Sequence, residues 1–72
     1  MEIGKRLIYL RKERQLSQEE LARQLNLSRG AIAMWETDKR KPDLDMLIHL
    51  ADFFNVSIDY ILCRTENPEI NR

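Results

Sequence analysis

The stretch LSQEELARQLNLSRGAIAMWE, residues 16–36, contains two short amphipathic helical patterns that meet at Asn26. Ser17 and Glu20 have the spacing of a capping box, in which the serine oxygen accepts a backbone N–H and the glutamate reaches back to the cap. Asn26 tolerates the left-handed backbone that ends a helix, and Ser28 is a suitable cap for the next one. The stretch therefore predicts two short helices joined by a tight turn.

The two predicted helices can pack as a helix-turn-helix, a pair of helices joined by a turn of three or four residues. Ala22 is small enough, in the middle of the first helix, for the second helix to approach it closely. Ile32 and Trp35 have the spacing of an inward face on the second helix. The outward side of that helix then carries Ser28, Arg29, Gly30, Ala33, Met34 and Thr37.

Helical periodicity continues on both sides of this pair. We expect helices over residues 2–14 and 43–55 and a short helix capped by Ser57, with a polar loop over residues 37–42. Their apolar stripes are Ile3, Leu7 and Leu10; Leu44, Leu47, Ile48, Ala51 and Phe54; and Ile58, Ile61 and Leu62.

The composition fits one small helical domain. The 72 residues are 43% hydrophobic, with two Gly and two Pro, which predicts an all-α, compact five-helix fold over residues 1–63 and a polar, flexible tail over residues 64–72. Cys63 is the only cysteine, which excludes an internal disulfide and fits a reducing, cytoplasmic setting. No apolar run approaches the length of a membrane span. His49 has no partners at metal-ligand spacing, so we expect no metal, cofactor or small-molecule ligand.

The formal net charge is zero, but the charges are unevenly distributed. Residues 1–41 contain ten Lys or Arg against six Asp or Glu, a net of +4, whereas residues 42–72 contain two against six, a net of −4. Such asymmetry suggests a polyanionic partner for the basic half. Taken alone, it is equally compatible with ordinary solvated helix faces.

The chain resembles the DNA-binding domain of phage repressor and Cro-type regulators, the XRE helix-turn-helix family. The resemblance lies in the stretch quoted above, in DKRKPD (residues 38–43) and in LIHLADFFNVSIDYIL (residues 47–62). It implies a five-helix fold, a dimer on a two-fold operator and no enzymatic activity. It also implies that Gln18 touches a phosphate and braces the second helix of the pair, and that Arg11 and Glu36 form a structural salt bridge that orients this recognition helix.

We expect the outward side of residues 28–36 to enter the major groove of duplex DNA. Arg29 is the main candidate because its planar fork matches guanine O6 and N7; a solvated or phosphate-bound arginine is the alternative. Gly30 is unusual in a helix and is explained either by close approach to DNA or by simple tolerance. Related proteins often carry polar base readers here, whereas Ala33 and Met34 can contact only thymine methyl groups, so part of the specificity would come from DNA shape. The expected base-reading residues are Arg29, Gly30, Ala33 and Met34.

Contacts to the DNA backbone are expected around the same helix. Lys39, Arg40 and Lys41 are adjacent cations on the following loop, which suits phosphate neutralisation, although a plain solvated loop is the alternative. Backbone N–H groups at the start of the first helix of the pair also favour an anion. The expected phosphate-binding residues are Ser17, Gln18, Ser28, Thr37, Lys39, Arg40 and Lys41.

These expectations favour sequence-specific binding of double-stranded DNA by a transcriptional regulator, which we expect to be a repressor. A protein-interaction module or an antitoxin-type partner-binding domain is the alternative, but it would not need the basic loop and Arg29 together. One recognition helix contacts few bases, so we expect a homodimer on a two-fold operator. Its self-association, weak without DNA, is expected at the C-terminal apolar residues Phe53, Phe54, Val56, Tyr60 and Ile61.

Overall fold

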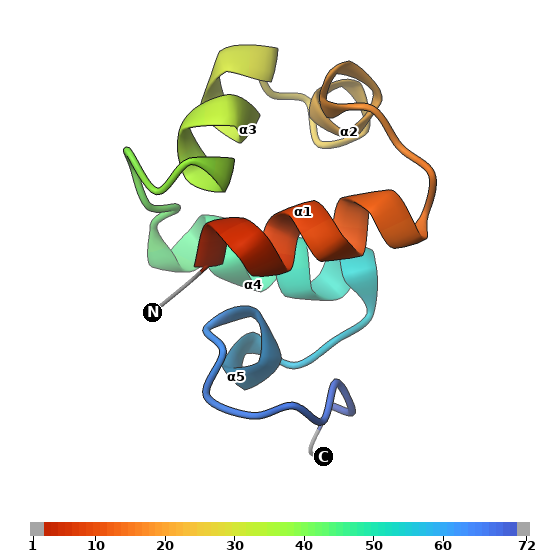
Figure 1. Cartoon of the computed structure of the whole chain (residues 1–72), viewed down its shortest axis with the longest axis vertical. Helices are drawn as coiled ribbons and strands as arrows, with labels where there is room; N and C mark the ends of the chain where they lie inside the picture. Colours follow the sequence, from red (N-terminus) through yellow and green to blue (C-terminus); the bar gives the residue numbers. More distant parts are fainter. Residues whose placement is uncertain (1–2, 71–72) are drawn as a thin grey trace.

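A computed structural model describes residues 3–70 of the chain. Its helices are α1 (Ile3–Glu13), α2 (Gln18–Gln24), α3 (Arg29–Glu36), α4 (Leu44–Phe54) and α5 (Ile58–Ile61), and the described residues contain no strand. The predicted all-α, five-helix architecture is confirmed. In Figure 1, α1 and α4 cross the middle of the molecule, α2 and α3 lie at one end of its longest axis, and α5 lies at the other.

Local chemistry sets the ends of these helices. Asn26 and Asn55 adopt the left-handed backbone, with φ of 59° and 56°, and so confirm the predicted stops. The first helix covers most of the expected residues 2–14, of which Glu2 lies outside the described residues. Each predicted N-cap accepts, on its side-chain oxygen, the backbone N–H three residues further on; the four caps are Ser17, Ser28, Asp43 and Ser57.

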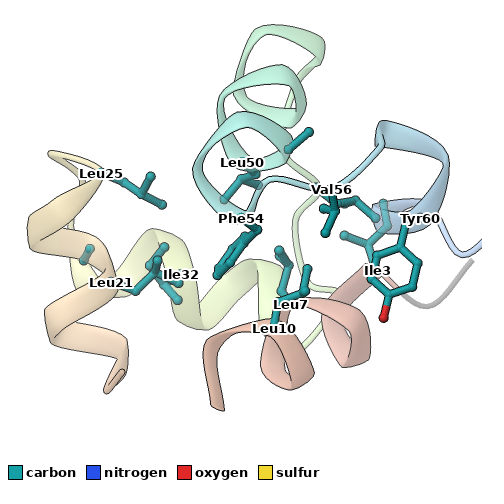
Figure 2. Close-up of a cluster of buried hydrophobic side chains, with 13 residues drawn as sticks. Ile3, Leu7, Leu10, Leu21, Leu25, Ile32, Leu50, Phe54, Val56 and Tyr60 are labelled. Atoms are coloured by element: carbon teal, nitrogen blue, oxygen red, sulfur yellow. The ribbon is translucent and has the colours of Figure 1, made fainter. Parts of the chain in front are cut away.

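A single hydrophobic core joins all five helices (Figure 2). In the close-up, Phe54 lies between the side chains of α1 and those of α2 and α3. Ala22 is 3% exposed, as its predicted place between α2 and α3 requires. Burying one large aliphatic side chain contributes roughly 1.5–3 kcal/mol, so packing rather than helix propensity holds these short helices. The largest fully buried side chains come one from each helix: Leu7, Leu21, Ile32, Leu50 and Ile61.

The buried face of α4 differs from the predicted stripe. Leu44 and Ile48 were expected to face the core but are 66% and 42% exposed, whereas Leu50 is fully buried. The core side of α4 is centred between Leu50 and Phe54, and at about 100° per residue Leu44 and Ile48 lie roughly 100° and 140° around the helix from it. The helix therefore presents two apolar side chains to solvent.

The residues expected to mediate self-association belong instead to the core of one chain. Phe54, Val56, Tyr60 and Ile61 are each 7% exposed or less, and Phe53 is partly buried against the same cluster. The reason is that α5 packs on α1 and α4 and covers these side chains. They cannot also form a free surface, so that expectation was wrong.

Residues 64–70 fold back along α5. The Ser57 N–H donates to the Pro68 carbonyl oxygen at 3.0 Å, and an Arg6 Nη2–Glu66 Oε1 ion pair measures 3.2 Å. The Arg6 guanidinium also lies 3.9 Å from the centroid of the Tyr60 ring. Burial alone would lower the pKa of Arg6, but its hydrogen bonds, first of all to Glu66, outweigh burial and raise that pKa above its usual value. The segment is therefore attached to the domain at both points, and its expected flexibility stays a prediction.

Candidate nucleic-acid interface

The turn between α2 and α3 is closed by backbone and side-chain hydrogen bonds. Ser17 and Glu20 form the predicted capping box: the Glu20 N–H donates to Ser17 Oγ and the Ser17 N–H donates to Glu20 Oε1, both at 3.0 Å. After Asn26, the Leu27 N–H donates back to the Ala22 carbonyl oxygen at 2.8 Å. The angle between the two helices is thus set by short-range contacts.

The inner side of α3 is fixed by packing. Ile32 is 1% exposed, and Trp35 is partly buried against the core, so both expected inward residues are confirmed as inward. Glu36, in the last turn, is 6% exposed although it is charged. A helix anchored in this way has only its opposite side free for a partner.

Of the four expected base-reading residues, Gly30 and Met34 lie on that opposite side, Ala33 lies on its flank, and Arg29 is the first residue of the helix. Arg29 and Gly30 are exposed, Met34 is 42% exposed and Ala33 is half-buried. A Cβ added to Gly30 would have only Ser28 Oγ near it, at 3.9 Å, so nothing within the protein requires glycine there. Both explanations of Gly30, close approach to DNA and simple tolerance, therefore stay open.

The hydroxyl groups proposed for phosphate binding differ in what they can donate. Ser17 Oγ and Ser28 Oγ each accept a backbone N–H, which leaves the hydroxyl hydrogen available for an anion. Thr37 is different because its Oγ1 donates to the Ala33 carbonyl oxygen at 2.8 Å. Its hydrogen would have to leave this bond to reach a phosphate, which the sequence alone did not reveal.

Glu36 is the centre of a polar network that joins three parts of the chain. Arg11 Nε and Nη2 donate to Glu36 Oε2 and Oε1 at 2.7 and 3.1 Å, and Gln18 Nε2 donates to Oε1 at 2.9 Å. Arg11 Nη1 also donates to the Leu16 carbonyl oxygen at 2.9 Å. The network connects the start of α2 and the end of α1 to the last turn of α3, and one N–H of the Gln18 amide remains for another acceptor.

The basic loop begins directly at the C-terminal end of α3. The N–H groups of Lys39 and Arg40 both donate to the Met34 carbonyl oxygen, at 3.0 and 3.2 Å, so the chain turns sharply there. The side chains of Lys39, Arg40 and Lys41 are exposed, and Pro42 after them is buried. Three exposed cations therefore follow the last turn of α3 directly.

Gly4 and Asp38 form a long-range contact at the end of α3 that the sequence did not single out. The Gly4 N–H donates to Asp38 Oδ1 at 3.1 Å, across 34 positions in the sequence. A Cβ on Gly4 would overlap the Glu36 carbonyl oxygen and lie 2.9 Å from Asp38 Oδ2. A glycine inside a helical pattern was a possible signal of this close approach, but its partner could not be identified locally.

The remaining electrostatic features are local. The hydrogen bond from the Ser17 backbone N–H lowers the pKa of Glu20 below its usual value. Within residues 3–70, no three His, Cys, Asp or Glu side chains are grouped so that they could hold a metal ion. No helix in the same range is long and apolar enough to cross a membrane.

Comparison with known proteins places this arrangement in a family. The family model described as Helix-turn-helix matches residues 7–61, which include the whole of α2, the turn and α3. The chain belongs to the XRE-type helix-turn-helix family. The family expected from the sequence is thus confirmed.

Members of the XRE-type helix-turn-helix family similar to this chain include named regulators. The HTH-type transcriptional regulator ImmR of Bacillus subtilis (strain 168) is 39% identical over 71 residues, which cover 99% of this chain and 56% of ImmR. The HTH-type transcriptional activator BcrR of Enterococcus faecalis is 42% identical over 66 residues, covering 92% of this chain and 32% of BcrR. The immunity repressor protein of Bacillus phage phi105 is 36% identical over 76 residues, covering 99% of this chain and 53% of the repressor. The chain thus spans about half the length of two of these relatives and about a third of the other.

Proposed function

We propose that this chain binds duplex DNA through the outward side of α3 and thereby regulates transcription. The observation that carries the proposal is that α3 is anchored by Ile32 and the Glu36 network while Arg29 and Gly30 stay exposed. An α-helix about 10–12 Å wide fits a major groove about 12 Å across. The names of the related regulators support the same assignment.

In this proposal Arg29 contacts base edges and Arg40 contacts phosphates. Arg29 is the first residue of α3, and the N-terminal residues of a recognition helix are those nearest the bases in this class of complex. Arg40 lies in the loop after α3, where a cation neutralises the backbone without distinguishing sequences. Gln18 and the hydroxyls of Ser17 and Ser28 complete the proposed phosphate contacts.

The test compares Arg29→Ala with Arg40→Ala on duplexes selected from a random pool, with affinity measured by fluorescence anisotropy over a range of salt concentrations. Arg29→Ala should lose about 1–3 kcal/mol of discrimination between selected and unselected duplexes. Arg40→Ala should weaken binding to all duplexes alike and reduce the slope of log K against log salt by about one.

A matched control is Arg64→Ala, which removes the same charge from a side chain that is 70% exposed beyond α5. It should leave discrimination intact and change affinity least. Identical behaviour of the Arg29 and Arg40 variants would contradict the division of labour. Absence of salt-dependent binding by the unmodified chain would contradict the function itself.

We also propose that two copies bind a two-fold operator, with their α3 helices about 34 Å apart. The contact surface replaces the one expected from the sequence and consists of Leu44, Ile48 and Ile70, all at least 37% exposed. Ile48 and Ile70 line the same shallow hollow beside α4. Stable interfaces bury about 800 Å² on each partner, far more than three partly exposed side chains provide, so association is weak without DNA.

Sedimentation with and without a selected palindromic duplex tests this surface. The chain should be mainly monomeric alone and bind two copies per duplex, and Ile48→Asp should reduce the second binding step. Tyr9→Asp serves as the control, because Tyr9 is a 51% exposed aromatic side chain on α1 that belongs to none of the proposed contacts. A tight dimer at nanomolar concentration, or unchanged co-binding by Ile48→Asp, would refute the surface proposed here.

The direction of regulation is proposed to be repression, through occupation of a site that overlaps a promoter. The relatives include both an immunity repressor and an activator, so their names alone do not decide the direction. A reporter placed behind the selected operator should be expressed less when the chain is present. Increased expression would instead assign activation.

A further inference from the structure

Asp38 has a backbone conformation for which glycine would suffice. Its φ is 58°, in the left-handed region that follows many helices, and its N–H donates to the Trp35 carbonyl oxygen at 3.2 Å as part of the helix end. Glycine adopts this conformation without cost, and Asp is among the few other residues that tolerate it. The backbone alone therefore does not explain a carboxylate at this position.

The carboxylate of Asp38 connects the end of α3 to the beginning of α1. Its Oδ1 accepts the Gly4 N–H at 3.1 Å, in the first turn of α1, where backbone N–H groups have no partner within the helix. Negative charge is favoured at that position by the helix dipole, and the first turn of α1 contains no acidic residue of its own. Asp38, 34 residues away in the sequence, thus supplies the first turn of α1 with a hydrogen-bond acceptor that a neighbouring N-cap residue commonly provides.

Gly4 makes this connection possible because it has no side chain. A Cβ there would overlap the Glu36 carbonyl oxygen, so only glycine lets the backbone of α1 touch the last turn of α3. The last turn of α3 is then held twice by α1: by the Gly4–Asp38 hydrogen bond and by the Arg11–Glu36 ion pair. The Arg11–Glu36 ion pair fixes α3 itself. The Gly4–Asp38 hydrogen bond lies just after α3, at the start of the basic loop.

Residues that pack against the rest of the domain therefore flank the basic loop on both sides. Asp38 is tied to α1 on one side, and Pro42 is buried on the other, with only Lys39, Arg40 and Lys41 between them. A loop that is already ordered loses less conformational freedom when its side chains bind a partner. A carboxylate beside a phosphate-binding loop also repels DNA. The negative charge of Asp38 therefore cannot favour DNA binding, whereas its hydrogen bond can.

We propose that Asp38 is a positioning residue for DNA phosphate binding: by accepting the Gly4 N–H, its carboxylate holds the Lys39–Lys41 loop in the conformation that contacts the DNA backbone. This inference rests on the proposed function. It differs from a general stabilising role because it makes the contribution of the loop lysines depend on the acceptor at position 38. It also assigns a role to two residues that touch no nucleic acid themselves.

Two substitutions at Asp38 separate the hydrogen bond from charge and backbone effects. Asp38→Asn keeps an oxygen acceptor and the tolerance for a left-handed backbone, whereas Asp38→Gly keeps only the backbone freedom. Both remove the same negative charge, so a difference between them cannot come from net charge. Each is combined with Lys41→Gln, which removes one cation of the loop.

The experiment measures the affinity of these variants for a duplex of mixed sequence at a temperature where all of them are folded, as checked by circular dichroism. Asp38→Asn should bind at least as tightly as the unmodified chain, and Asp38→Gly should bind roughly three- to tenfold more weakly than Asp38→Asn, in keeping with the modest net contribution of one hydrogen bond. Lys41→Gln should cost more affinity, and remove more of the salt dependence, in the Asn background than in the Gly background.

Equal affinity of Asp38→Gly and Asp38→Asn, or an equal effect of Lys41→Gln in both backgrounds, would overturn the inference while leaving DNA binding in place. Failure of the unmodified chain to bind any duplex in a salt-dependent manner would overturn the proposed function, and this inference with it. Amide hydrogen exchange in the free protein gives an independent readout: exchange at Lys39 and Arg40, whose N–H groups donate to the Met34 carbonyl oxygen, should be faster in Asp38→Gly than in Asp38→Asn. Unchanged exchange would also count against the inference.

Discussion

Replacing Arg11 with methionine should remove much of the stability of this domain. The substitution leaves the Glu36 carboxylate, whose side chain is 3% exposed, with the Gln18 amide as its only remaining partner among the contacts of this network. Removing one partner of a buried ion pair costs about 3–5 kcal/mol, because the other charge stays buried and unpaired. Arg11 itself is 13% exposed, which places the expected loss near the lower end of that range, at about 3 kcal/mol.

The loss expected for Arg11→Met is large relative to the total free energy of unfolding. A domain of 72 residues is expected to have a free energy of unfolding of about 4–11 kcal/mol. At 4–8 °C for each kcal/mol, a loss of about 3 kcal/mol corresponds to a decrease in Tm of roughly 12–24 °C. The chain has a single tryptophan, Trp35, next to Glu36, so urea unfolding can be followed by its fluorescence.

A double-mutant cycle isolates the pair from the general effect of mutation. Glu36→Leu should cost less than Arg11→Met, because Arg11 keeps its bond to the Leu16 carbonyl oxygen and can turn toward solvent. The double variant should recover at least about 2 kcal/mol relative to the sum of the single losses, because an apolar pair can replace a buried ion pair at little cost. A loss below about 1 kcal/mol in Arg11→Met, or strict additivity in the cycle, would refute the argument from burial.

Three further predictions concern local geometry. Gly30→Ala should raise the free energy of unfolding by about 0.5–1 kcal/mol in urea titrations, because the added Cβ has only Ser28 Oγ nearby, at 3.9 Å. A loss of duplex affinity in Gly30→Ala would then favour close approach to DNA, and unchanged affinity would favour simple tolerance. A loss of stability would contradict the conclusion that an added Cβ meets no obstacle at this position. The pKa of Glu20 is lowered by the hydrogen bond from the Ser17 backbone, so ionised Glu20 should stabilise the fold above its unfolded pKa of about 4.3 and lose this effect as the pH falls through the lower folded value. The Tm difference between the unmodified chain and Glu20→Gln should accordingly diminish in acid, and a difference independent of pH would contradict the capping box. Asn26→Val should cost about 1–2 kcal/mol, and Asn26→Gly much less, because φ is 59° at this residue; equal losses in the two variants would count against backbone strain.

The sequence predicts those features whose partners lie within a few residues. Ser17 and Ser28 cap their helices because the N–H groups they accept are three residues away, and Asn26 turns the chain because of its own backbone preference. The outward positions of Gly30 and Met34, two residues on either side of Ile32, follow from its inward position by helix geometry alone. These are properties of one helix or one turn, so a pattern in the sequence is enough.

Other features depend on how distant segments pack, and a single sequence does not contain that information. An apolar periodicity on α4 does not say which side of the stripe the other helices will cover, which is why Leu44 and Ile48 were assigned to the core. The partner of Gly4 is 34 positions away, and the oxygen that Ser57 binds belongs to Pro68 in a segment with no pattern of its own. Which bases and phosphates are contacted remains a prediction, because it depends on a partner molecule.

The return of residues 64–70 along α5 determines where a covalently attached module would be placed. This segment and α5 lie at the opposite end of the longest axis from α2 and α3, in a molecule whose greatest extent is 31 Å (Figure 1). A fluorescent reporter joined after Ile70 would therefore lie far from α3, but next to the proposed contact surface that includes Ile70. The same label joined ahead of Ile3 would sit beside the Gly4–Asp38 hydrogen bond, so labelling at the two ends would be far from equivalent.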